Sequence, residues 1–542
     1  MYNDYEDDDI PLELVLTPNL YPSNLEEEEY EHSHSIESVN SAVNGLPEEI
    51  KKFIFKFHHA LVENNYYELQ YIYENLFNKL TERYYAKSSW PDPEVVSHLV
   101  SDDQVFLTLY RELYYRHIYS KLQPSIEHRF QSYENYCDLF NYILNSDGPV
   151  PLELPNQWLW DIIDEFIYQF QTFSTFRNKI KSKTEEELIL LKENPQVWSC
   201  YSVLNVLYSL IQKSSIYEHL EALKNGEEPG LQLEVEEKED YINKPLYKML
   251  GYFSIIGLLR VHCLLGNYTM ALKTLDNVDL SKKSPFHRVI ACHVTVYYYI
   301  GFCYMMMRRY ADAIRSFSHI LSFMARTKIF QTKSYQFDQM NKKVDQMYAL
   351  LAMCISLFSS RVDEHIHNTL KEKYSEQMSS MRTLESNLST YEELYLYSCP
   401  KFISPTLTKM DESEQKQSAT QYQLSIFLQE VKHQYLIPTL RSYLALYSTL
   451  SIEKLASFLN IDKDEVRRQL LILKLKSKQK KQLNVGNLLD GQYTLASDLD
   501  FTVNKDIIMV TEHKIARRYG DWYIRNISKF EDMIDSLKIR KN

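Results

Sequence analysis

Residues 297–317 read YYYIGFCYMMMRRYADAIRSF, and this stretch decides the fold class. It carries two helical patterns, whose periodic positions are Tyr297, Ile300, Gly301 and Tyr304, followed by Tyr310, Ala313 and Phe317. Small residues at Gly301 and Ala313 allow two helices to approach closely, and the large residues around them fill the remaining space. The stretch therefore predicts a closely packed pair of helices.

A weaker copy of the pattern lies 42 residues earlier, where Tyr268, Ala271 and Leu275 match the second helix. Leu259 and His262 stand where the first helix of the better copy has Gly and Tyr. The order of aromatic, aliphatic, Gly, Tyr, Ala and Phe follows the tetratricopeptide (TPR) layout. Two imperfect copies predict a mainly α fold whose body is a right-handed, TPR-like helical-repeat solenoid, not a regular array.

Helical periodicity also fills the chain from residue 46 to about residue 222. Residues 157–170 are apolar on most of a helical circumference, which predicts an interior helix. This helix carries Asp161, Asp164 and Glu165 about one turn apart. No His lies at ligand spacing on the same helix, so we interpret these carboxylates as solvated or as contacts to neighbouring helices, not as a metal or acid–base site.

Length and composition agree with a helical protein of several packed parts. A chain of 542 residues exceeds one hydrophobic core. It has only 11 Gly, whereas β-rich and nucleotide-binding folds spend glycine on turns and phosphate loops. The seven Cys have no C-x-x-C spacing and no recognisable secretory signal precedes them, which favours buried thiols and a cytoplasmic location.

The net charge of −13 is concentrated at the amino terminus. Residues 1–45 contain twelve Asp and Glu and no Lys or Arg, so the remaining chain is nearly neutral. Such a segment cannot bury enough apolar surface to fold, and we expect a disordered acidic tail. A second acidic stretch with Gly and Pro, residues 223–243, is expected to be a linker.

The only strong strand signals lie near the carboxyl terminus. Residues 451–461 read as a short helix capped by Ser451 and ended by Asn460, and Asp462 with Glu465 forms a capping-box pattern that opens a second helix. Strand text then follows at residues 493–495, 501–503 and 507–510. Two helices followed by a small sheet predict a winged helix.

The last helix, from about residue 512 to residue 537, has a broad apolar stripe. The heptad-like positions of this stripe are Ala516, Tyr519, Tyr523, Phe530 and Leu537. A solitary terminal helix does not need such a stripe, so we expect it to pack on a helix of a partner. With the strand residues Tyr493, Thr494 and Leu495, the stripe forms the candidate subunit interface.

A winged helix also raises a nucleic-acid hypothesis. Seven basic residues follow one another without nearby acids in the sequence: Arg467, Arg468, Lys474, Lys476, Lys478, Lys480 and Lys481. Most of them follow the second helix, and side chains suited to base edges are not clustered on one face. Sequence-specific DNA binding is therefore disfavoured, while a weak RNA contact stays an alternative to a solvated basic face.

Patterns that would indicate an enzyme are missing. The sequence has no phosphate-binding glycine loop, no nucleophile elbow and no zinc-protease helix motif. We therefore expect no catalytic residues, no cofactor, no metal site and no small-molecule substrate. The longest nearly apolar run, residues 294–307, is too short to cross a membrane.

Helical repeats that feed a carboxyl-terminal winged helix resemble PCI-domain proteins, the scaffold subunits of the proteasome lid, the signalosome and translation initiation factor 3. Longer strings resemble, within these, the L-subunit family of eukaryotic translation initiation factor 3. They are residues 113–119, 147–170, 246–253, 307–314, 391–394, 398–402 and 516–521. The resemblance covers nearly all of the chain after residue 45.

The resemblance implies a non-catalytic scaffold subunit of the initiation factor 3 complex, which binds the small ribosomal subunit, promotes pre-initiation complex assembly and recruits mRNA. It implies other PCI subunits as partners, with the K subunit nearest. A PCI subunit of another assembly and a winged-helix nucleic-acid-binding protein are the alternatives. The predicted parts are a tail (1–45), a helical domain (46–222), a linker (223–243), a TPR-like region (244–435), a winged helix (436–510) and a bundle helix (511–542).

Overall fold

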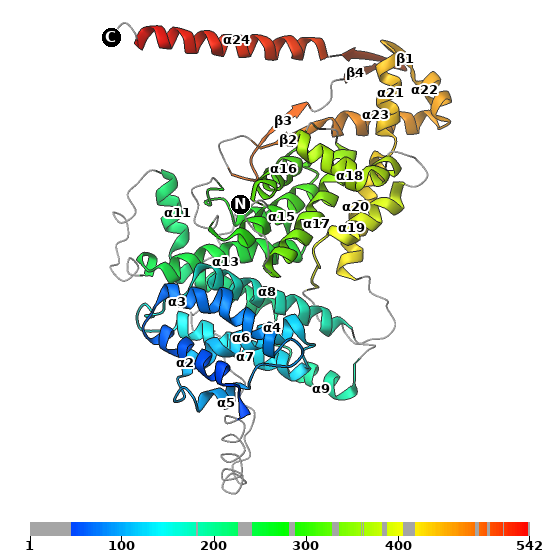
Figure 1. The fold of residues 1–542 in the computed structure, drawn as a ribbon. Coiled ribbons are helices and arrows are strands. Elements are labelled where there is room, and N and C mark those ends of the chain that lie inside the picture. Colours follow the sequence, from blue (N-terminus) through cyan, green and yellow to red (C-terminus); the bar gives the residue numbers. More distant parts are fainter. Residues whose placement is uncertain are drawn as a thin grey trace, which may run out of the picture. The chain divides into compact units, whose positions relative to one another are not determined.

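Helices make up most of the computed structural model, so the predicted mainly α fold class is confirmed (Figure 1). The structure describes residues 45–179, 183–225, 241–280, 288–327, 335–358, 360, 362–381, 387–404, 418–482, 487–495, 499–512 and 514–539. The predicted acidic tail and most of the predicted linker lie outside these residues. Their expected disorder is therefore not addressed by the structure.

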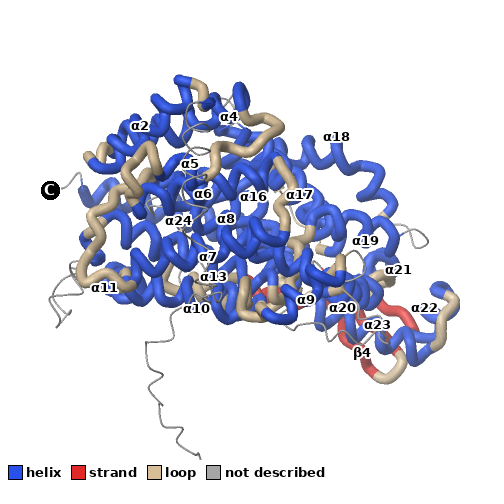
Figure 2. Tube along the Cα trace, turned by 90° about the horizontal axis from the view of Figure 1, so that it is seen from below, coloured by secondary structure: helices blue, strands red, loops and turns tan. Residues whose placement is uncertain are grey.

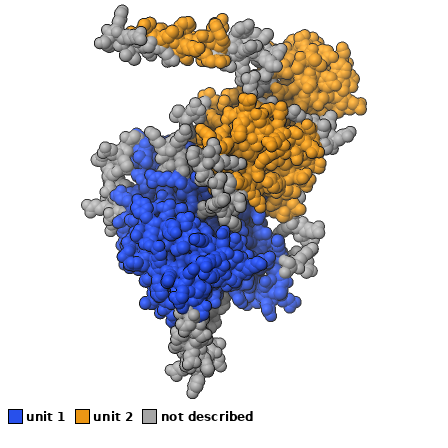
Figure 3. Space-filling model, viewed as in Figure 1, with its two compact units in different colours: residues 1–296, 401–416 blue, residues 297–400, 417–542 orange. Residues whose placement is uncertain are grey.

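The chain divides into two compact units (Figure 3). Unit 1 comprises residues 1–296 and 401–416, and unit 2 comprises residues 297–400 and 417–542. The division falls inside helix α15 (Ile290–Met306). It does not coincide with the stretch 223–243, where the sequence predicts a linker.

All the elements of regular secondary structure in the described residues of unit 1 are helices. Its helices are α2 (Glu48–Val62), α3 (Tyr66–Tyr71), η1 (Ile72–Leu76), α4 (Phe77–Tyr84), α5 (Pro93–Ser97), α6 (Gln104–Lys121), α7 (Ile126–Leu144), α8 (Asn156–Asn178), α9 (Glu185–Glu193), α10 (Cys200–Lys213), α11 (Ile216–Asn225), α13 (Pro245–Leu264) and α14 (Tyr268–Lys273). Several begin at a side-chain cap, such as Asp103 before α6 and Thr184 before α9, because these oxygens satisfy the first free amides.

The core of unit 1 gathers around α8 and α13. The predicted interior helix at residues 157–170 is confirmed, because Trp158, Phe166 and Phe170 of α8 are almost fully buried. α8 packs on α6, α7 and α13, and α13 packs on α10 and α14 (Figures 1 and 2). α13 is buried on nearly its whole circumference, since neighbours cover it on several sides.

Unit 2 continues from α15 through further helices and all the strands of the described residues. The helices are α16 (Tyr310–Thr327), α17 (Tyr335–Leu357), α18 (Glu364–Ser380), α19 (Asn387–Ser398), α20 (Ala419–Gln434), α21 (Ile437–Leu446), α22 (Ile452–Leu459), α23 (Lys463–Lys476) and α24 (Lys514–Ile539). The strands are β1 (Thr449–Ser451), β2 (Lys478–Lys481), β3 (Gln492–Leu495), β4 (Leu499–Asn504) and β5 (Ile507–Glu512).

The α15–α16 pair has the close approach that its sequence predicts. A Cβ atom on Gly301 would lie 2.4 Å from the ring of Phe317, so only glycine fits there. Ala313 is fully buried in the same pair. In the weaker copy Ala271 is also fully buried, but α14 is only a short helix of six residues.

Two small sheets follow α21. The first is antiparallel with strand order β1-β5-β4, and the second pairs β2 with β3, also antiparallel. The strands predicted near residues 493–495, 501–503 and 507–510 are confirmed as β3, β4 and β5. β1 and β2 were missed, because β1 has three residues and β2 reads Lys-Gln-Lys-Lys, which has no β-branched or aromatic residue.

The helix ends of this region follow the predicted caps with one correction. Ser451 accepts a hydrogen bond from the amide of Lys454, and Asn460 ends α22 in the left-handed conformation with φ 53°. Asp462 caps α23, but the reciprocal capping-box bond is not formed. Glu465 instead accepts a hydrogen bond from Nε2 of Gln469, one turn further along the helix.

One hydrophobic core joins α21, α22, α23 and the three-stranded sheet. Its fully or nearly buried members are Leu436, Leu440, Leu444, Leu450, Ile452, Leu455, Ala456, Val466, Leu470, Leu473, Phe501 and Ile508. Alternation along β5 places Ile508 inside, while Ile507 and Met509 are exposed. The β1-β5-β4 sheet therefore has one face on the core and one open face.

Candidate interaction surfaces

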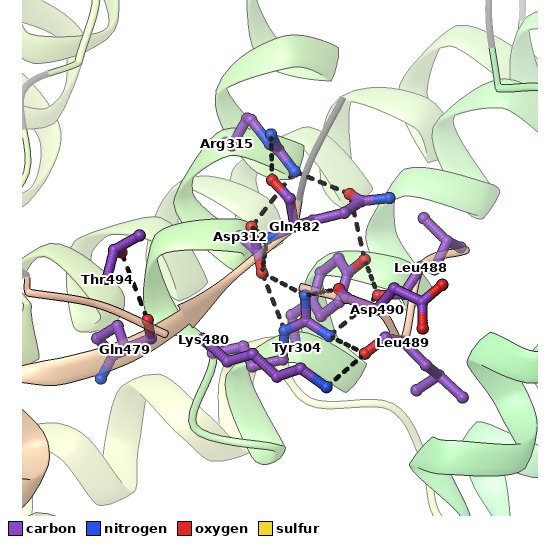
Figure 4. Close-up of polar contacts among 11 residues, drawn as sticks. Tyr304, Asp312, Arg315, Gln479, Lys480, Gln482, Leu488, Leu489, Asp490 and Thr494 are labelled. Atoms are coloured by element: carbon purple, nitrogen blue, oxygen red, sulfur yellow. Dashed lines mark hydrogen bonds and ion pairs between the residues drawn. The ribbon is translucent and has the colours of Figure 1, made fainter. Parts of the chain in front are cut away.

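The β2–β3 hairpin is fastened to helix α16 by a buried ion pair that we call the hairpin anchor (Figure 4). It consists of Arg309 and Asp312, together with the backbone carbonyls of Leu488, Leu489 and Asp490. Nε and Nη2 of Arg309 donate to Oδ2 of Asp312 at 2.9 and 2.7 Å. Both side chains are at least 95% buried.

The guanidinium group uses its remaining N–H groups on the loop before β3. Nη1 donates to the carbonyls of Leu488 and Leu489, each at 3.0 Å, and Nη2 donates to the carbonyl of Asp490 at 3.0 Å. The carboxylate of Asp312 accepts from the amide of Gln482 at 3.0 and 3.1 Å. The anchor therefore satisfies its own charge and also holds both ends of the loop between β2 and β3.

Further contacts surround the anchor. Nη2 of Arg315 donates to Oδ1 of Asp312 at 3.3 Å and to Oε1 of Gln482 at 2.8 Å. The hydroxyl of Tyr304 donates to the carbonyl of Leu488 at 2.9 Å, and the guanidinium of Arg309 lies over the Tyr304 ring, 4.7 Å from its centroid. Gly491 sits where a Cβ atom would be 2.6 Å from the carbonyl oxygen of Lys481. A glycine at this position lets the loop close tightly onto β2.

The predicted interface residues of β3 lie on this anchored hairpin. Tyr493 is 75% exposed and Thr494 is also exposed, while Leu495 is half-buried. In the described part of the chain β3 pairs with β2 and with no other strand. β4 likewise pairs with β5 only, so each sheet ends in an edge strand that offers backbone groups for strand addition.

Helix α24 carries the predicted apolar stripe in the open. Tyr523, Phe530 and Leu537 are 59%, 60% and 63% exposed. Five further large apolar side chains of α24 are at least half exposed, namely Trp522, Ile524, Ile527, Met533 and Ile534. The helix also includes positions 516 and 519, whose side chains lie outside the described residues.

The basic run on α23 and β2 is largely neutralised. Arg467 pairs with Asp464 and Asp506, and Arg468 pairs with Glu465. Lys474 pairs with Asp500, and Lys476 pairs with the buried Glu430. The expectation that no acidic residue lies near this run is wrong, because folding brings carboxylates from α20, β4 and the β4–β5 turn beside it. Lys478, Lys480 and Lys481 have no acidic partner within the described residues, and Nζ of Lys480 donates to the carbonyl of Leu489 instead.

The carboxylates of α8 contact other helices, as one of the two interpretations predicts. Asp161 accepts hydrogen bonds from the Tyr73 hydroxyl and from Gln157, and it lies 3.7 Å from Arg116. Asp164 pairs with Arg260 of α13. Burial raises the pKa of Asp161 and of Glu165 to about 7 each, although Arg116 acts against both increases.

Within the residues that the structure describes, no group of three or more His, Cys, Asp or Glu side chains could hold a metal ion. No described helix combines the length and the continuous apolar surface that crossing a bilayer requires.

Comparisons with known proteins match most of the chain to one family model and to relatives that share one name. A family model described as RNA polymerase I-associated factor PAF67 matches residues 128–530. Eukaryotic translation initiation factor 3 subunit L from Mycosarcoma maydis is 51% identical over 91% of this chain and 75% of the relative. The proteins of the same name from Nematostella vectensis and Homo sapiens are 50% and 46% identical, over 91% and 98% of this chain and 93% and 99% of their own lengths.

Proposed function

Because the chain belongs to the family of eukaryotic translation initiation factor 3 subunit L, it is a non-catalytic subunit of the initiation factor 3 complex, and we propose that it acts there as a scaffold. A scaffold needs surfaces that engage other chains, and unit 2 has an open helix and open strand edges. Eight large apolar side chains that are at least half exposed along α24 carry this proposal. The stripe has no cover within the described part of the chain and is too long to be incidental.

We propose that the helices from residue 244 to residue 435 form a TPR-like solenoid and that residues 436–510 form the winged helix of a PCI domain. The close α15–α16 pair supports the first part, through Gly301 against Phe317. The order β1, α22, α23, β4, β5 around one core supports the second. We keep residues 1–45, 46–222, 223–243 and 511–542 as tail, helical domain, linker and bundle helix.

The partners follow from the exposed surfaces and the family. Other PCI subunits, with the K subunit nearest, would add strands at the edges near Tyr493–Leu495 and β4 and would pack helices on α24. The small ribosomal subunit would be reached through the complex, and the protein would then be cytoplasmic. Lys478 and Lys481, which have no acidic partner among the described residues, could bind RNA weakly. Replacing both by Ala should then lower RNA retention without loss of complex assembly.

The stripe variant I527D/F530D/I534D tests the scaffold proposal. We expect it to lose most of its association with factor 3 subunits in affinity capture from cells, because three charges would face an apolar partner. The variant S528D/K529D changes the net charge equally on exposed neighbouring positions of α24 and should be retained. Full retention of the stripe variant would contradict the bundle role of α24.

A further inference from the structure

The β2–β3 hairpin is an insertion in the carboxyl-terminal part of unit 2. It lies between α23 and β4 in the chain and forms a two-stranded sheet of its own, separate from the β1-β5-β4 sheet. Within the described residues β3 pairs only with β2, in a register that sets Tyr493 opposite Lys480. The outer edge of β3 therefore presents backbone N–H and C=O groups that no described strand uses.

This edge is held in place by the hairpin anchor. Arg309 binds the carbonyls of the loop that leads into β3, and Asp312 accepts the amide of Gln482, which follows β2. A strand that is already ordered loses little conformational entropy when another strand joins it. Tyr493, at 75% exposure, stands on this fixed edge with its side chain in solvent. The hairpin is therefore preorganised to receive a further strand.

The lysines of β2 give the hairpin a positive charge. Lys478 and Lys481 are exposed, and Nζ of the half-buried Lys480 donates to the carbonyl of Leu489 at 2.9 Å. None of the three lysines pairs with a carboxylate within the described residues. Alternation places Lys478 and Lys480 on the same face as Tyr493, and Lys481 on the opposite face. Each face of the hairpin thus carries lysine charge that no described carboxylate neutralises.

The charge and the edge together select the chemistry of the added strand. A strand beside β3 would lie two strand spacings, about 10 Å, from β2. A lysine and a glutamate side chain together span this distance, so acidic residues of the added strand can reach Lys478 on one face and Lys481 on the other. The hydroxyl of Tyr493 is a further donor on the first face. An acidic strand therefore gains ion pairs in addition to backbone hydrogen bonds.

We propose that β3 binds an extended, acidic segment of a partner protein, which joins the hairpin as a third strand. The proposal rests on the scaffold function proposed above and specifies the chemistry of one partner. RNA fits this edge less well, because phosphates only accept hydrogen bonds, whereas a strand edge presents acceptors as well as donors. A peptide backbone satisfies both.

Fluorescence anisotropy with the full-length chain tests this proposal. The probe is a labelled peptide in which Glu alternates with Val. We expect the peptide to bind the unaltered chain, and we expect K478E/K481E to raise its dissociation constant about tenfold or more, because repulsion replaces two attractions. Both replaced side chains are exposed, so the hairpin should stay folded, which hydrogen exchange at the β2 and β3 amides verifies.

Two controls separate charge from strand addition. The variant K52E/K79E makes the same charge change at exposed positions of α2 and α4 and should alter the dissociation constant less than about twofold. The same peptide with N-methylated central amides keeps its charge but cannot donate to a strand edge, so it should bind about tenfold more weakly or worse.

Three results would overturn the proposal: no binding to the unaltered chain, equal loss in the two lysine variants, or undiminished binding of the methylated peptide. So would tighter binding of an oligouridylate RNA with the same dependence on Lys478 and Lys481, since that would assign these lysines to RNA. Capture of factor 3 subunits through α24 is measured separately, so none of these outcomes decides the scaffold proposal.

Discussion

At the residue scale, the hairpin anchor depends on contacts between residues far apart in the chain, which the sequence alone could not predict. Arg309 immediately precedes α16 and Asp312 lies in its first turn, three residues later, a spacing that many exposed helical ion pairs share. Their partners Gln482 and Leu488 are more than 160 residues away in the chain. Periodicity predicted the small residues Gly301 and Ala313 correctly, because their role is local to one helix pair. The role of Arg309 depends on a loop that only the fold brings near.

Removing the guanidinium should therefore be costly. We expect Arg309→Ala to destabilise the hairpin by about 1–3 kcal/mol, because it removes the donors to three loop carbonyls and leaves Asp312 with only the exposed Arg315 as its cation. Hydrogen exchange at the β2, β3 and Gln482 amides would measure it. Arg309→Lys should rescue little, since an ammonium cannot reach a carboxylate and three carbonyls at once. The control is Arg326→Ala, which removes an exposed arginine of α16. Unchanged hairpin protection in Arg309→Ala would contradict the anchor.

The glycine contact offers a second test. Gly301→Ala should lower the free energy of unfolding by about 1–3 kcal/mol, because the new methyl group collides with the Phe317 ring. The double variant with Phe317→Leu should recover part of this loss. Gly148→Ala meets no atom within 4 Å and should be nearly neutral in the same thermal melts. Equal effects of the two alanine substitutions would rule out a packing role for Gly301.

At the element scale, the helices were predictable from the sequence, whereas the strands β1 and β2 were not. Period and caps placed the helices at α8, α16, α22, α23 and α24, since each signal is local. β2 escaped because its lysines favour solvent, and it forms only by pairing with β3 on the anchored loop. The candidate interface at Tyr493 and along α24 could be foreseen from exposed apolar periodicity.

We expect that removing helix α24 leaves the rest of the chain folded and about as stable as before. Truncation after Glu512 keeps β5 whole, whereas truncation after Val510 would cut it. We expect the truncated protein to keep its melting temperature within about 2 °C, since the described side chains of α24 are nearly all exposed. It should nevertheless lose most of its capture of factor 3 subunits. A large fall in melting temperature would show that α24 stabilises its own chain.

At the scale of the whole molecule, buried carboxyls of unit 1 couple stability to pH. The folded-state pKa of Asp161 and of Glu165 is about 7, above the value of about 4 in an unfolded chain. Between these values the folded chain binds more protons than the unfolded chain. Their contribution to stability therefore falls as pH rises from about 4 to 7 and levels off above 7.

The variant D161N/E165Q should flatten that part of the pH profile. We expect it to be more stable than the unaltered chain at pH 8 by about 1–2 kcal/mol, because neutral amides avoid the burial cost of two charges. Urea unfolding at pH 5 and pH 8 would measure the difference. E185Q/E186Q on exposed α9 serves as control and should leave the profile unchanged. A profile as steep as that of the unaltered chain would exclude these two carboxyls as its source.

The hairpin anchor also has a consequence for synthesis on the ribosome. Arg309 leaves the exit tunnel 179 residues ahead of the Leu488 carbonyl that it binds. At about 5–20 residues per second, the pair waits roughly 10–35 s for its acceptors. During that interval α16 has been synthesised, but the loop that buries Arg309 and Asp312 has not. The hairpin can therefore dock beside α16 only after residues 488–490 have emerged, and until then water solvates Arg309 and Asp312.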